Sequence, residues 1–282
     1  MYYSLVIVAV VLFGGCFALN DAYQKLRSSS LAESMALGFI GSVAGLAILL
    51  PMGGFKPQFT LFTLLIALLS ALNGMAYTFC SLKALERVNL SLYSLFAMLG
   101  GMLLPFLQGI IFYGEKITLP KIICLLLIGG ALALSVSKEQ RKGGFLWYAG
   151  IFVLNGMSGV LSKIFTASTF EKTSAEWFSI WGALLSALLS GILWLILSRK
   201  DWKPYSWKAF GLAFANGGIN RFANFLLVIA LVHLDASIQY PMITGGVIIV
   251  STVICFFKKE KPKAKELLAV ALSFIGLLIL AF

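Results

Sequence analysis

The chain consists almost entirely of apolar segments about twenty residues long, and this pattern decides its fold class. A membrane-spanning helix needs about 20 apolar residues because the hydrocarbon core of a bilayer is about 30 Å thick. Short stretches that are polar or contain Gly and Pro separate the segments, and they leave no room for a sizeable soluble domain. The segments cover residues 2–24, 31–51, 60–82, 92–113, 118–136, 145–167, 175–197, 207–231, 237–257 and 266–282.

The composition excludes an ordinary soluble protein. Charged residues make up 12% of the chain, 60% is hydrophobic and the mean hydropathy is +0.96. A soluble domain has about 25% charged residues, which it needs to cover a surface that faces water. Runs such as 122–128 and 183–189 do not alternate between apolar and polar residues, as strands of a membrane barrel do. We therefore predict an all-α integral membrane protein with ten transmembrane helices.

The two halves of the sequence repeat one another. Residues 84–91 read ALERVNLS and residues 230–237 read ALVHLDAS, and each stretch ends one long segment and leads into the next. A pair of glycines follows in both halves, and then a short charged turn, 114–116 (GEK) in the first half and 259–261 (KEK) in the second. The prediction is two five-helix repeats, 1–141 and 142–282. An odd number of spans per repeat inserts the second one upside down, an arrangement that recurs in transporters with a site between the repeats.

The order and spacing of these motifs resemble the drug/metabolite transporter (DMT) superfamily, specifically its ten-span EamA-like branch. The resemblance covers essentially the whole chain and includes Asn155-Gly156-Met157-Ser158 in the sixth segment. It implies a bundle of ten helices around a central cavity and substrates that are small metabolites. It does not name the substrate, because members of this superfamily differ widely in what they carry.

Basic residues are distributed unevenly between the two sets of loops. Loops that follow odd-numbered segments hold about four times as many Lys and Arg residues as the others, and such loops face the cytoplasm. This count predicts a multi-pass protein of the plasma membrane with both termini outside. The family resemblance implies cytoplasmic termini, so the two expectations conflict, and we follow the charge count. The net charge of +11 is accounted for by this topology signal, and no aromatic-basic patch indicates nucleic-acid binding.

Arg221 is the clearest candidate for a functional residue, because it lies well inside the eighth segment. A charged side chain at the centre of a bilayer costs about 3 kcal/mol on insertion scales and is a functional candidate by default. A helix places Asn220 and Asn224 on one stripe beside it. A guanidinium binds a carboxylate or a phosphate through two parallel hydrogen bonds. The alternative is a structural bond from Arg221 to carbonyl groups or to a neighbouring helix.

Other polar residues within the segments are weaker candidates. Lys163 and Asp21 are candidates for coupling or proton transfer, although both lie where a helix nears the interface. Further candidates for substrate binding are Asn155, Ser158, Asn73, Tyr77, Tyr93, Gln239, Tyr240 and Trp181. We expect the cavity to be lined by the first, third, sixth, eighth and ninth spans.

Several chemistries lack the residues they need. The single histidine, His233, lies in a short turn and the four cysteines are scattered, so we expect no catalytic triad, no metal site and no cofactor. No nucleotide-binding loop of the Walker type is present. We do not expect an enzyme.

The leading hypothesis is a secondary transporter that moves an amino acid or an organic anion across the plasma membrane by alternating access. Export of cationic drugs or metabolites, with Asp21 as the carboxylate, is the alternative within transport, and a lipid flippase also remains open. A non-transporting scaffold subunit is the alternative from another class. The expected partners are the small-molecule substrate and the lipid bilayer, and assembly as a homodimer is left open.

Overall fold

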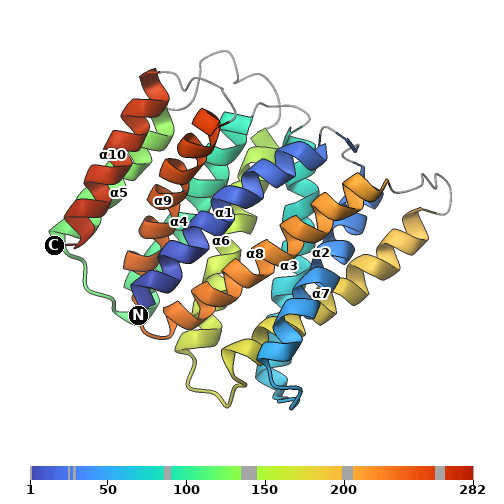
Figure 1. The fold of residues 1–282 in the computed structure, drawn as a ribbon. Coiled ribbons are helices and arrows are strands. Elements are labelled where there is room, and N and C mark those ends of the chain that lie inside the picture. The colour runs from blue at the N-terminus through green and yellow to red at the C-terminus, as the bar shows by residue number, and fades with distance from the viewer. Residues whose placement is uncertain are drawn as a thin grey trace.

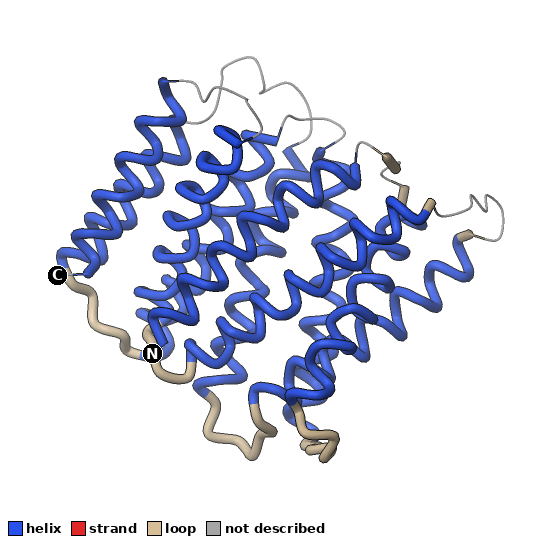
Figure 2. Tube along the Cα trace, in the orientation of Figure 1, coloured by secondary structure: helices blue, strands red, loops and turns tan. Residues whose placement is uncertain are grey.

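The computed structural model describes residues 2–24, 26–27, 30–85, 90–134, 145–198, 206–257 and 264–281. All the regular secondary structure of these residues is helical (Figure 2). The ten helices are α1 (Tyr2–Gln24), α2 (Leu31–Met52), α3 (Leu61–Leu85), α4 (Leu90–Tyr113), α5 (Leu119–Leu134), α6 (Phe145–Ala167), α7 (Ala175–Leu197), α8 (Trp207–Leu231), α9 (Ala236–Phe257) and α10 (Ala264–Ala281). Their ends agree with the predicted segments to within a few residues, so the prediction of ten helices is confirmed for the described part of the chain.

Seven of these helices, α1–α4 and α6–α8, are long and apolar enough to cross a membrane. The described parts of α5, α9 and α10 contain shorter apolar stretches. Serines begin three of the helices. The side chains of Ser30, Ser174 and Ser206 accept hydrogen bonds from backbone N–H groups in the first turns of α2, α7 and α8. Such caps satisfy donors that a helix start leaves free, so these serines set where the helices begin.

The helices form a bundle in which successive helices run in opposite directions, and both termini lie at the same end (Figure 1). We call this end the terminus end; it also carries the loops 53–60, 114–118, 168–174 and 232–235. We call the opposite end the basic end, because α1, α3, α5, α7 and α9 end there and the stretches that follow them in the sequence hold most of the Lys and Arg residues.

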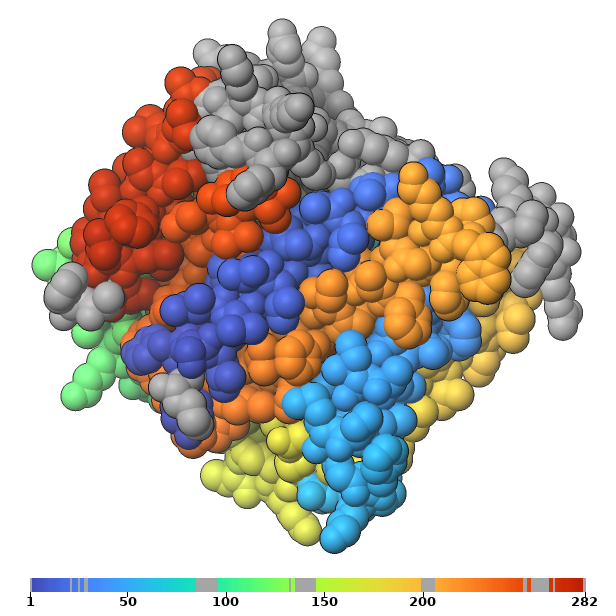
Figure 3. Space-filling model, in the orientation of Figure 1, coloured from blue at the N-terminus to red at the C-terminus, as the bar shows by residue number. Residues whose placement is uncertain are grey.

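Most helix contacts join the first five helices to the last five. The main contacts come in pairs: α4 packs on α6 as α9 packs on α1, α1 packs on α8 as α6 packs on α3, and α2 packs on α8 as α7 packs on α3. Within each pair, one contact becomes the other when α1–α5 are exchanged for α6–α10 in the same order. Figure 3 shows one such neighbourhood, with α1 between α8 and α9 on one face of the molecule. The helices α5 and α10 pack on each other at one edge of the bundle (Figure 1).

The crossing of α2 over α8 depends on two glycines. A Cβ atom on Gly41 would lie 2.9 Å from the Cα atom of Gly217, so neither position has room for a side chain. Small residues of this kind let helix backbones approach closely in a membrane. One turn further along each helix the same crossing places Gly45 of α2 against Arg221 of α8.

Candidate functional site

A cavity of about 380 Å³ lies among eight helices, all except α5 and α10. It is large enough for a small metabolite, since ligand pockets have volumes of about 300–1,000 Å³. Its polar lining consists mainly of serine hydroxyls and asparagine carboxamides. Among the described residues, Arg221 is the charged side chain that lines it, and no Asp or Glu does.

The predicted set of lining helices was incomplete. Besides α1, α3, α6, α8 and α9, the helices α2, α4 and α7 also line the cavity. The sequence did not reveal α2 and α7 because they contribute small residues that are equally common at ordinary helix contacts, such as Gly38, Ser42, Gly182 and Ser186.

Arg221 projects from α8 towards α2. Its Nη2 atom donates a hydrogen bond to Ser42 Oγ over 2.9 Å, and Ser42 in turn donates to Ser186 Oγ on α7 over 3.0 Å. The absence of a side chain at Gly45 makes this possible, because a Cβ atom there would lie 2.6 Å from Arg221 Cγ. Packing against α2 therefore fixes the stem of the arginine, and α2 and α7 supply hydroxyl groups beside its head.

The charge of Arg221 has no carboxylate partner in the described part of the chain. The bond to Ser42 is the one polar contact that its guanidinium makes there, although the group has five N–H donors. A cation that is removed from water without a counter-ion is unfavourable. An anion inside the cavity would satisfy both the charge and the free donors.

Carboxamides from α8 and α1 form a second polar cluster in the cavity wall. Asn224 Nδ2 donates to the carbonyl oxygen and to Oδ1 of Asn220, over 2.8 and 3.0 Å. Asn216 Nδ2 donates to Asn20 Oδ1 over 2.8 Å, which ties α8 to α1. The Oδ1 atom of Asn216 is buried and has no hydrogen-bond partner in the described structure. Asn216 therefore joins α8 to α1 and keeps one buried acceptor that the described residues leave unpaired.

Two candidates on α6 face the cavity, and one on α3 does not. Asn155 and Ser158 line the cavity. Asn155 Nδ2 is also bonded to the carbonyl oxygen of Ala97 on α4 over 2.6 Å. Asn73 of α3 does not line the cavity; its Nδ2 atom donates to the carbonyl oxygen of Leu154 and to Ser158 Oγ, over 2.9 and 3.0 Å. Asn73 therefore joins α3 to α6 and orients Ser158.

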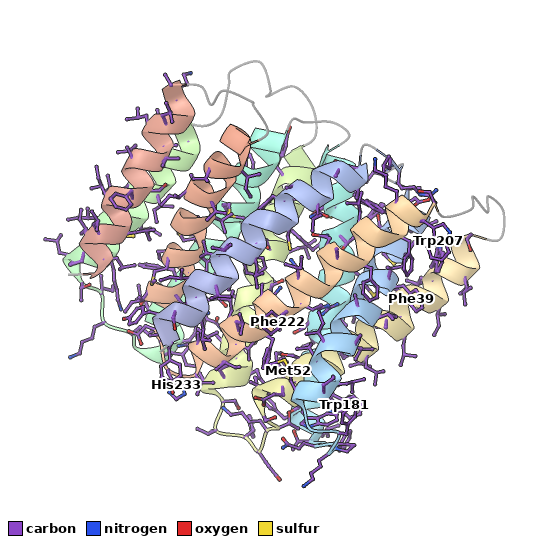
Figure 4. The ribbon with its side chains drawn as sticks, in the orientation of Figure 1. Phe39, Met52, Trp181, Trp207, Phe222 and His233 are labelled. Atoms are coloured by element: carbon purple, nitrogen blue, oxygen red, sulfur yellow. The ribbon has the colours of Figure 1, made fainter. Side chains whose placement is uncertain are left out.

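Of the aromatic candidates with described side chains, together with Gln239, two line the cavity and two do not. Tyr77 and Tyr240 line it. Gln239 is fully buried and donates from Nε2 to the carbonyl oxygen of Leu227 over 3.0 Å. Trp181 lies near the terminus end and donates from Nε1 to the carbonyl oxygen of Gln58 over 2.8 Å (Figure 4). Gln239 and Trp181 thus make structural bonds between segments.

Two predicted residues, Tyr93 and Asp21, lie outside the side chains that the structure describes. Metal ligands are also not gathered: the described residues contain no group of three or more His, Cys, Asp or Glu side chains that could hold a metal ion.

Lys163 lies outside the cavity, in a buried ion pair that the sequence analysis did not foresee. Its Nζ atom lies 2.7 Å from Oε1 of Glu115, a residue in the turn between α4 and α5. The same carboxylate accepts hydrogen bonds from the backbone N–H groups of Ala236 and Ser237, both over 2.9 Å, at the start of α9. Burial alone would raise the pKa of Glu115, but the bonds from Lys163 and from these N–H groups outweigh it and hold the pKa below its usual value. The sequence signal for Glu115 was its place in the repeated charged turn.

Comparisons with known proteins establish the fold only. No protein-family model and no curated protein matches the chain. A solved structure described as "Crystal structure of protein" is similar to it, with a TM-score of 0.76, over 99% of this chain and 95% of the other. The two sequences are 18% identical, so the similarity shows that the whole chain adopts a fold seen by experiment and carries no statement about function.

Proposed function

We propose that the protein is a secondary transporter that binds a small anionic or zwitterionic metabolite at Arg221 in its central cavity. The observation that carries this proposal is the guanidinium that lines the cavity without a carboxylate partner among the described residues. A structural arginine would be expected to spend its donors on carbonyl groups or on an acidic side chain. Among the described residues, the bond from Arg221 to Ser42 leaves most of the guanidinium donors for a ligand.

The proposal includes a plasma membrane location, ten spans and two inverted repeats, 1–141 and 142–282. Seven helices of spanning length and apolarity support the membrane location. The exchange pattern of the helix contacts supports the repeats, because α1–α5 and α6–α10 take equivalent places in it. The position of the cavity between the halves is the one expected of an inverted-repeat transporter. Membership of the DMT superfamily, in its EamA-like branch, is part of the same proposal, with the basic end in the cytoplasm.

Within anions, the lining favours an amino acid or a hydroxy acid over a simple carboxylate. Arg221 would bind the carboxylate, and the serine hydroxyls and asparagine carboxamides of the lining would accept a hydrogen bond from an ammonium or hydroxyl group. Sites that hydrogen-bond a polar group strongly reject analogues that lack it, because the buried protein group is then left unpaired.

A ligand screen by thermal shift tests this function on the purified protein in detergent. Amino acids, organic anions, nucleotide sugars and quaternary amines are tested against it. Stabilisation by a zwitterion or anion supports the proposal, since a ligand that binds only the folded state raises Tm by mass action. Stabilisation by quaternary amines alone favours export of cations, with Asp21 as the residue to test. A scaffold subunit would show no ligand-dependent shift.

A further inference from the structure

The buried ion pair of Lys163 and Glu115 lies about one helical turn beyond the cavity, towards the terminus end. The cavity wall there is formed by Tyr240 of α9 and Gly159 of α6, where the tyrosine hydroxyl donates to the glycine carbonyl oxygen over 3.2 Å. Four residues further along α6 is Lys163, and four residues back along α9 is Ala236. A step of four residues is about one turn and keeps the same helix face, so both residues continue this wall outward.

Glu115 closes the space between these two helices. Its carboxylate accepts from Lys163 of α6 and from the first N–H groups of α9, and 5% of its side chain is exposed. The turn that carries it is held against α4, because the Glu115 N–H donates to the carbonyl oxygen of Gly109 and a Cβ atom at Gly109 would lie 2.6 Å from Glu115 Oε2. One carboxylate therefore joins the α4–α5 turn of the first half to α6 and α9 of the second half. We call this set of bonds the Glu115 contact.

Neutral bonds tie the neighbouring helices at the same end. Thr173 N–H donates to Thr63 Oγ1 over 3.0 Å and Ser174 N–H donates to Gln58 Oε1 over 2.8 Å, which joins the α6–α7 loop to the start of α3. Unlike these bonds, the Glu115 contact combines a charge pair with a helix cap, and both are favourable for a carboxylate at a helix N-terminus.

We propose that Glu115 is a positioning residue for transport: it holds the terminus end of the cavity closed through Lys163 and the start of α9, and the cavity opens to that side when this contact breaks. The inference rests on the proposed function, because alternating access requires each end of the cavity to open in turn. The contact is placed for this role, since it bridges the two halves that would move relative to each other and lies directly outside the cavity wall.

Cysteine labelling tests the proposal without knowledge of the substrate. The four native cysteines are replaced, and a single reporter, Ser162→Cys, is introduced in the cavity lining beside Lys163. A second single-cysteine protein, Glu171→Cys, carries its thiol in the exposed α6–α7 loop and identifies the terminus end. Both are labelled with a membrane-impermeant maleimide in intact cells and in inside-out vesicles, so that each side of the membrane is read separately.

We expect Glu115→Gln to speed labelling of the reporter by about tenfold from the side on which Glu171→Cys reacts, and not from the other side. Lys163→Gln should act in the same way, whereas Lys163→Arg keeps the charge and should label at the unsubstituted rate. Asp235→Asn, which removes the exposed partner of Lys121 at the same end, is the matched control and should change nothing.

Unchanged labelling in a folded Glu115→Gln protein would overturn the proposal, and so would an equal increase from both sides, which indicates general loosening. If Glu115→Gln does not reach the membrane, Lys163→Gln and Lys163→Arg decide the question by the same comparison. A one-sided increase in labelling together with a failed ligand screen would support the proposed role of Glu115 and contradict the proposed substrate class. A successful ligand screen without a one-sided increase would support the substrate class and contradict the role of Glu115.

Discussion

Lys163 and Arg221 are two cations on helices of the same bundle, and their surroundings differ. Lys163 has a carboxylate 2.7 Å away, lies outside the cavity and is 10% exposed. Arg221 lines the cavity, and a serine hydroxyl at 2.9 Å is its polar partner in the described structure. Within the described residues, a buried carboxylate thus lies beside the lysine, and none lies beside the arginine.

Under the proposed function, this difference separates a structural charge, Lys163, from the charge that would bind the ligand, Arg221. A paired charge contributes to the fold, and removal of one partner leaves the other buried and uncompensated. An unpaired charge in a cavity contributes little to the fold until an anion binds to it. The sequence distinguishes the two only by depth, since Lys163 lies nearer a helix end than Arg221, and the structure is needed to show which of them has a carboxylate partner.

The largest effect is expected when the lysine is removed. Lys163→Met leaves Glu115 buried without its cation, which costs about 3–5 kcal/mol and lowers Tm by roughly 10 °C. Thermal unfolding in detergent measures this, with Arg221→Gln as the matched variant, which should lie close to the unsubstituted protein in the absence of ligand. If the two variants lose equal stability, the comparison between the cations fails.

A methyl group added beside Arg221 tests whether the position of this side chain matters for ligand binding. In Gly45→Ala, the new Cβ atom would lie 2.6 Å from Arg221 Cγ and 2.8 Å from its Cβ, so the side chain must move. We expect a loss of about 1–3 kcal/mol in stability from overpacking, and weaker stabilisation by the anionic ligand although Arg221 is still present. Gly182→Ala, which has open space at its Cβ position in the same cavity, is the control. Ligand binding that survives Gly45→Ala unchanged would show that the position of Arg221 is unimportant.

The ion pair of Lys163 with Glu115 should also make the stability of the protein depend on pH. Because the pKa of Glu115 is depressed in the folded state, its contribution to stability is present above its ordinary pKa of 4.5 and is lost as the pH falls through the lower folded value. The carboxylate faces Lys163 and the α9 N-terminus, with Tyr240 nearby. Tm of the unsubstituted protein should therefore fall more steeply below about pH 4.5 than Tm of Glu115→Gln. Parallel curves for the two proteins would contradict this assignment.

The smallest effect is expected at the second ion pair of the terminus end. Lys121 Nζ lies 3.2 Å from Asp235 Oδ2, but the aspartate side chain is 48% exposed. Exposed pairs contribute about 0–1 kcal/mol, so Asp235→Asn should change Tm by no more than a few degrees. A loss as large as that of Lys163→Met would mean that burial does not distinguish these pairs.

Much of the fold could be predicted from the sequence because apolar length and loop polarity determine the helices in a membrane. The placement of Arg221, Asn155 and Tyr240 at a cavity followed from polar residues in apolar segments. The role of Glu115 could not be predicted, since its partners lie 48 and 121 residues away and one of them is the backbone of a helix start. Side chains that bond between helices, such as Asn73, have the same sequence signature as side chains that face a cavity.

The central claim is that Arg221 is the ligand-binding cation, and the thermal shift of one ligand on three proteins tests it most directly. The anionic or zwitterionic compound that stabilises the unsubstituted protein is titrated against Arg221→Gln and Arg221→Lys. We expect no shift for Arg221→Gln and a reduced shift for Arg221→Lys, which keeps the charge but loses the two parallel hydrogen bonds of a guanidinium. An undiminished shift in Arg221→Gln, with Tm otherwise unchanged, would contradict the account.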